Sequence, residues 1–145
     1  MSKAREYISS NTIEIRPDLK GIKDDNNCTI KSFSIAYGIP YPIAYEIGKQ
    51  TGRRHGKGHY MHGMMEYAKK QGYEMVEITI RKSLYQFLLE NPRGRFIAVR
   101  RGHAFPIVNG KIYDVVPNPP KSIIKRLWQV KSKKGEVAQS LYGHY

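Results

Sequence analysis

The sequence predicts an α+β fold, with helices concentrated in the first half of the chain and antiparallel strands in the second. Apolar residues recur at helical spacing after Cys28 and again over residues 60–71, which is typical of helices that face a core. Residues 74–80 alternate between polar and apolar types, as a half-buried strand does. Asn109-Gly110 stands between two strand-like segments and is a strong signal for a tight hairpin.

The chain of 145 residues is expected to form a single domain with three parts. Residues 1–23 are a polar lead-in segment, in which residues 12–15 alternate and are predicted to form an edge strand before Pro17. The core is expected over residues 24–116, and residues 117–145 form a basic C-terminal segment.

The helices are expected to follow one another from residue 28 onward. Residues 24–27 are of helix N-cap types, so a buried helix is predicted at about residues 28–37, with Gly38 ending it. A second helix carries Pro42 in its first turn, and a third covers residues 60–71.

The second half of the chain is predicted to be mainly strands. Ser83 followed three residues later by Gln86 is a capping-box pattern, which predicts a short helix that ends near residue 90. The region around Trp128 is a candidate for one further element. The predicted strands lie at residues 74–80, 95–101, 102–108 and 111–116.

The charge balance is strongly basic, with 25 Lys and Arg against 12 Asp and Glu and a formal net charge of +13. Such a field attracts nucleic acid, acidic protein surfaces or anionic membranes, although a high charge also serves solubility alone. No apolar run is long enough to span a membrane, and no secretory signal precedes the core, so a cytoplasmic protein is expected.

Cys28 is the only cysteine, and it lies at the predicted start of a buried helix. No internal disulfide can form, and the positive end of a helix favours a thiolate over a thiol. Cys28 is therefore a candidate nucleophile. The alternative is that it is a small buried apolar residue, as most single cytosolic cysteines are.

His103 is a candidate base, because it lies among apolar residues in a predicted strand. A two-residue turn at Asn109-Gly110 pairs Phe105 with Asp114 and puts Asp114 on the same face as His103, within reach of the imidazole. Asn118 is the reserve orienter, a second candidate for the residue that orients His103. Alternatively, Asp114 is a charge at the end of a strand that faces water. Pro106 has no N–H for this ladder, so a bulge or a shifted register is the alternative there.

Several segments resemble those of known cysteine peptidases. Asn27-Cys28-Thr29-Ile30-Lys31-Ser32 and the segments up to Gly58 resemble a phage and bacterial family that looks papain-like. Residues 88–99, Gly102-His103-Ala104 and residues 109–114 resemble the histidine half of bacteriocin-processing and related peptidases. This resemblance covers residues 24–116. It implies a papain-like core in which a helix bearing the cysteine packs against a bent antiparallel sheet bearing the histidine.

The resemblance implies acyl transfer, with one departure from the family pattern. Papain-like enzymes place a glutamine about six residues before the cysteine to complete the oxyanion hole, whereas this chain has Gly21 and Ile22 there. Asn26 and Asn27 are the candidate oxyanion donors in its place, together with the Cys28 backbone N–H.

Two hypotheses follow from these residues. The first is a phage-encoded cysteine peptidase or amidohydrolase that cleaves a peptide or isopeptide bond, with an acidic substrate favoured by a basic rim. The second is a catalytically inactive papain-like scaffold that binds a host protein or nucleic acid. No cofactor motif is present, and glycines between His55, His59 and His62 argue against a metal site. The basic rim is expected to comprise Arg53, Arg54, Lys57, Arg100 and Arg101.

Overall fold

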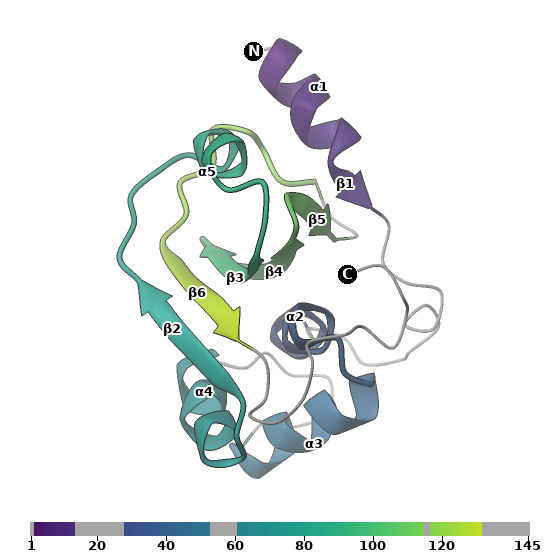
Figure 1. Cartoon of the computed structure of the whole chain (residues 1–145), viewed down its shortest axis with the longest axis vertical. Coiled ribbons are helices and arrows are strands. Elements are labelled where there is room, and N and C mark those ends of the chain that lie inside the picture. The colour runs from purple at the N-terminus through teal and green to yellow at the C-terminus, as the bar shows by residue number, and fades with distance from the viewer. Residues whose placement is uncertain (1, 14–27, 53–60, 115–116, 132–145) are drawn as a thin grey trace.

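The computed structural model describes residues 2–13, 28–52, 61–114 and 117–131, and it has an α+β architecture with one six-stranded sheet (Figure 1). The strand order is β1-β5-β4-β3-β6-β2. β1 pairs in parallel with β5, and every other pair is antiparallel. The strands are β1 (Thr12–Ile13), β2 (Glu74–Ile78), β3 (Arg95–Arg100), β4 (His103–Val108), β5 (Lys111–Tyr113) and β6 (Arg126–Lys131). The predicted fold class, helices with an antiparallel sheet, is confirmed.

Helices cover both faces of this sheet. The helices are α1 (Ser2–Ser10), α2 (Cys28–Tyr37), α3 (Tyr41–Gln50), α4 (Met61–Lys70) and α5 (Leu84–Glu90). Alternate residues of β3 enter separate apolar clusters, since Ile97 belongs to the cluster that contains α2 while Phe96 and Ala98 belong to the one that contains α5. The sheet therefore separates two cores, with α2, α3 and α4 on one face and α1 and α5 on the other (Figure 1).

α2 is the central helix of the larger core. Eight of its ten residues are buried, so it is enclosed on nearly all sides by β3, β4, β6 and α3. Gly38 follows the helix with a φ of 69°, and the backbone N–H of Ile39 donates to the carbonyl of Ser34 at 3.0 Å. This is the glycine-terminated end that the sequence predicts, because a left-handed φ costs glycine little.

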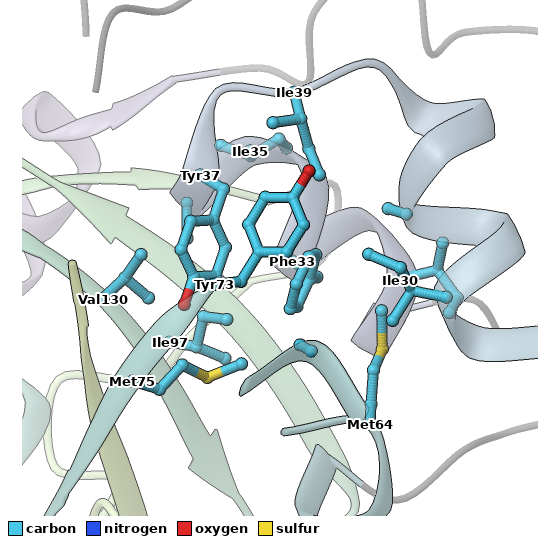
Figure 2. Close-up of a cluster of buried hydrophobic side chains, with 14 of the residues drawn as sticks. Ile30, Phe33, Ile35, Tyr37, Ile39, Met64, Tyr73, Met75, Ile97 and Val130 are labelled. Carbon is cyan, nitrogen blue, oxygen red and sulfur yellow. The ribbon is translucent and has the colours of Figure 1, made fainter. Parts of the chain in front are cut away.

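Aromatic rings fill the space between α2 and β2. Phe33 lies 4.7 Å from Tyr37 and 5.7 Å from Tyr73, measured between ring centroids, and Figure 2 shows the three rings side by side. Met64 of α4 enters the same cluster from the other side of Ile30 (Figure 2). Phe33 is fully buried, so this packing fixes the position of α2, and with it Cys28, relative to the sheet.

The β4–β5 hairpin has the predicted register. Asn109 and Gly110 have φ angles of 50° and 75°, and Val108 pairs with Lys111 across the turn. In the β3–β4 pair Pro106 lies opposite Ile97, and the predicted pairing of Phe105 with Asp114 across the hairpin is not part of the β4–β5 ladder. The β4–β5 pairs end at Ile107, one residue before Pro106, where no backbone N–H is available.

The lead-in and the C-terminal segment contain more secondary structure than the sequence predicts. The lead-in contains helix α1, whose Ile8 is buried against α5, in addition to the edge strand β1. The C-terminal segment supplies β6, which lies between β3 and β2, so the sheet extends to Lys131. The predicted strands were slightly too long: β2 ends at Ile78, and β5 ends at Tyr113.

The remaining helices agree with their sequence signals. α3 has a proline in its first turn, and α5 is capped by Ser83, whose side chain accepts the backbone N–H of Gln86 at 3.2 Å. The Gln86 side chain donates to Glu90 at 2.7 Å, one turn further along the helix.

Candidate active site

Cys28 is the first residue of α2, at the end of the helix that meets β4. Its thiol is partly buried and interacts with the His103 side chain, the backbone of Ala104 and the side chain of Thr29. The packing of α2 on β4 therefore brings a cysteine and a histidine together across 75 residues of sequence, as the sequence analysis expected.

His103 is the first residue of β4 and is held on two sides. Its Nε2 lies 2.6 Å from Oδ2 of Asp114, and its ring stacks on Phe105 with 5.9 Å between centroids and 21° between planes. Since Nε2 faces the carboxylate, Nδ1 is the ring nitrogen left for Cys28. The contact between His103 and Asp114 that the hairpin register predicts is present.

Asp114 follows β5 directly and is largely buried, with 8% of its side chain exposed. The alternative of a strand-end charge that faces water is therefore wrong. A buried carboxylate requires hydrogen-bond donors, and Oδ2 accepts from both His103 and the Asn118 amide, the latter at 2.8 Å.

The electrostatics favour a charged pair between thiol and imidazole. Burial raises the pKa of the Cys28 thiol, but the hydrogen bond with His103, the backbone of Ala104 and the charge of His103 outweigh it, so that the pKa lies below its ordinary value. The hydrogen bond with Asp114, together with the one to Cys28, outweighs desolvation and raises the pKa of His103 to about 9. The two pKa shifts mean that the thiolate of Cys28 and the imidazolium of His103 are favoured together.

Asn118, the predicted reserve orienter, hydrogen-bonds to Asp114, the residue that lies against His103. Its Nδ2 donates to Asp114, and its Oδ1 accepts from Nε of Arg100 at 2.8 Å. Arg100 also donates to the carbonyl of Pro117 at 3.1 Å. Arg100, a residue of the predicted basic rim, therefore uses two of its guanidinium N–H groups to bond beside Asp114.

A cleft of about 530 Å³ lies next to the acid side of this site. Asp114 and Asn118 form part of its wall, and Arg5, Ile8 and Thr12 line it from α1 and β1. Neither Cys28 nor His103 lines it, so the cleft borders the orienting groups and not the thiol.

Several predicted site residues lie outside the described residues. These are the oxyanion candidates Asn26 and Asn27 and the rim residues Arg53, Arg54 and Lys57. Arg101 is exposed in the turn between β3 and β4. Among the described residues, no group of three or more His, Cys, Asp or Glu has the arrangement of a metal site, and none of the helices there has the length and apolar character needed to cross a membrane.

Comparison with known proteins found no matching family model, no similar curated protein and no similar solved structure. The geometry around Cys28 is therefore the main evidence for a function of this chain.

Three contributors to the site were not identified from the sequence. The Ala104 backbone, the Thr29 side chain and the Phe105 ring each contact a reactive side chain. Thr29 and Ala104 adjoin Cys28 and His103 in the sequence, and Phe105 is two residues beyond His103 on the same side of β4, a spacing that was available as a signal.

Proposed function

We propose that the protein is a cysteine peptidase or amidohydrolase with a papain-like arrangement of its catalytic groups. The observation that carries the proposal is the pairing of Cys28 with a histidine whose other nitrogen lies 2.6 Å from a buried carboxylate. A nucleophile, a base within hydrogen-bond reach and a third group that orients the base are the combination that activates a thiol for acyl transfer.

In the proposed reaction the Cys28 thiolate attacks the carbonyl carbon of an amide and forms a C–S bond. The His103 imidazolium then gives its proton to the leaving nitrogen as the C–N bond breaks, which leaves a thioester on Cys28. Water next attacks the thioester and His103 accepts one of its protons, so that the carboxylic acid product leaves and the pair is restored. Asp114 keeps the Nε2 proton of His103 in place throughout, and Nδ1 handles the transferred proton.

The developing negative charge on the carbonyl oxygen needs donors near Cys28. The first N–H groups of a helix have no intrahelical acceptor, and Cys28 begins α2, so its own N–H is the donor we assign from the described residues. Asn26 and Asn27 remain the proposed second donors.

The proposal is tested by trapping the thioester. Purified protein is mixed with acidic peptide and isopeptide amides, quenched in acid within the first turnover and measured by intact mass. We expect an increase equal to the acyl group on the wild type and none on Cys28→Ala or His103→Ala. Product formed equally by wild type and Cys28→Ala would contradict the proposal.

A binding role on the same scaffold is the second candidate, favoured by the net charge of +13. In that case Cys28→Ala keeps full function, whereas charge reversal at Arg53 and Arg54 abolishes it. Affinity for a single-stranded oligonucleotide that falls steeply with salt in both wild type and Cys28→Ala would favour this role.

A further inference from the structure

Arg100, His103 and Asp114 gather on one face of the sheet. Arg100 lies directly opposite His103 in the β3–β4 pair, and cross-strand partners point to the same side. Asp114 reaches His103 from the end of β5, and Asn118 lies between Asp114 and Arg100. A continuous hydrogen-bonded chain therefore runs from a guanidinium, through an amide and a carboxylate, to the imidazole.

The chemistry of the two ends determines how the amide of Asn118 is oriented. A guanidinium has donors only, so it bonds to Oδ1, whereas an ionised carboxylate accepts only, so it faces Nδ2. The reversed amide would set donor against donor and acceptor against acceptor. Asn118 is 7% exposed, so water cannot easily replace either lost partner.

Arg100 is in turn fixed by a second bond. Its Nε donates to Asn118 and its NH2 nitrogen donates to the Pro117 carbonyl at 3.1 Å. Two donors from one planar group restrict the side chain to one geometry, which a lysine does not reproduce.

We propose that Arg100 and Asn118 are positioning residues, which hold the Asp114 carboxylate in the orientation that keeps the Nε2 proton of His103 toward Asp114 and Nδ1 toward Cys28. This inference rests on the proposed function for its significance. The effect of the hydrogen-bonded residues on Cys28 and His103 can nevertheless be measured without a substrate. Losing Asn118 removes a donor that orients the carboxylate, and losing Arg100 removes the donor that faces Oδ1 of the amide. In either case the bond to His103 weakens, and the Cys28 thiolate loses its partner.

The test uses Arg100→Gln and Asn118→Leu, with Arg126→Gln as the matched control. Arg126 is exposed on β6 opposite Val99. The control therefore removes one positive charge close to Arg100 and leaves the hydrogen bonds among Arg100, Asn118, Asp114 and His103 in place. Among the described residues, Arg5 lines the adjoining cleft together with Asp114, and this charge is unchanged in every variant. The readouts are the pH midpoint of Cys28 alkylation and the ¹⁵N shifts of the His103 ring, which report its protonation and, above its pKa of about 9, the tautomer of the neutral ring.

We expect the alkylation midpoint of Arg100→Gln and Asn118→Leu to rise by about one pH unit, the range for a weakened hydrogen bond to a charged group, and the neutral His103 ring to populate both tautomers. Arg126→Gln should match the wild type. Equal pH profiles of Cys28 alkylation for Arg100→Gln and Arg126→Gln would overturn the proposal. This comparison can be made even if Asn118→Leu fails to fold. A further outcome separates the two proposals. If Cys28 is alkylated at a lowered pH in an Arg100-dependent way but the protein cleaves no amide tested, the positioning role of Arg100 and Asn118 is upheld and the proposed hydrolase function fails.

Discussion

Nε2 of His103 lies 2.6 Å from Oδ2 of Asp114, although 11 positions of sequence separate the two residues. A tight turn at Asn109-Gly110 makes this contact, because it returns the chain beside β4 in a register that puts both side chains on one face. The short hairpin therefore sets the histidine tautomer, and the packing of α2 on β4 brings the thiol to the remaining nitrogen.

Asp114→Asn should disable this orientation while it preserves the shape of the site. An amide can present its N–H groups to Nε2, which would move the histidine proton to the nitrogen that faces Cys28. We expect the pKa of His103 to fall from about 9 toward its ordinary value of 6.5. Alkylation of Cys28 at pH 7 should slow by about tenfold or more, since the deprotonated thiol loses its partner. An unchanged alkylation rate with normal folding would contradict the assigned role of Asp114.

The stability of the protein should depend on pH through the same pair. His103 has a raised folded pKa, so its contribution to the free energy of unfolding is complete below about pH 6.5 and is lost as pH rises through about 9. Cys28 has a lowered folded pKa, so its contribution is present above the ordinary thiol pKa of about 8.5 and is lost as pH falls through the folded value. In the wild type the two trends partly cancel.

Cys28→Ala should therefore expose the histidine contribution alone. We expect its free energy of unfolding to fall more steeply than that of the wild type as pH rises above about 6.5, by at most about 1.4 kcal/mol per pH unit for one proton, over a range that ends below pH 9 because the part of the His103 pKa shift that comes from Cys28 is lost. Urea unfolding at several pH values measures this slope, and Cys28→Ala with His103→Ala serves as the control in which the extra slope disappears. Parallel curves for wild type and Cys28→Ala would show that the pair is not coupled.

Two glycine substitutions should have opposite effects on stability. Gly110 has a φ of 75°, and an added Cβ would meet the Pro92 carbonyl oxygen at 3.3 Å, so Gly110→Ala should destabilise the hairpin by about 1–2 kcal/mol. Gly63 lies within α4 with nothing within 4 Å of an added Cβ, so Gly63→Ala should stabilise by about 0.5–1 kcal/mol. Thermal unfolding of both variants checks the signs, and destabilisation by both would refute the assignment at Gly63.

The sequence predicted the local elements better than their assembly. Helical spacing, glycine ends and the Asn-Gly turn are encoded within a few residues, so the bounds of α2 and the register of the β4–β5 hairpin were recovered. The same turn predicted that Asp114 lies beside His103, and the two side chains are in contact.

Long-range relationships were harder to predict. α1 has few apolar residues and is held by burial of Ile8 against α5, and β6 enters the middle of the sheet between strands that precede it in sequence. Arg100 was grouped with other basic residues as a rim, and its bond to Asn118, 18 positions away, was not predicted. Such a contact depends on where the segment after β5 returns, which no short pattern in the sequence encodes.

The most direct test of the account is the pH dependence of Cys28 alkylation by iodoacetamide, compared between wild type and His103→Ala. The chain has one cysteine, so the total label reports this thiol alone. We predict that the wild type reacts at a pH below the ordinary thiol range of about 8.5, and that the midpoint of His103→Ala moves to that range or above it, because burial then raises the thiol pKa with less opposition. Identical profiles, or a thiol that is inert in the wild type, would contradict the assignment of Cys28 and His103 as an activated pair.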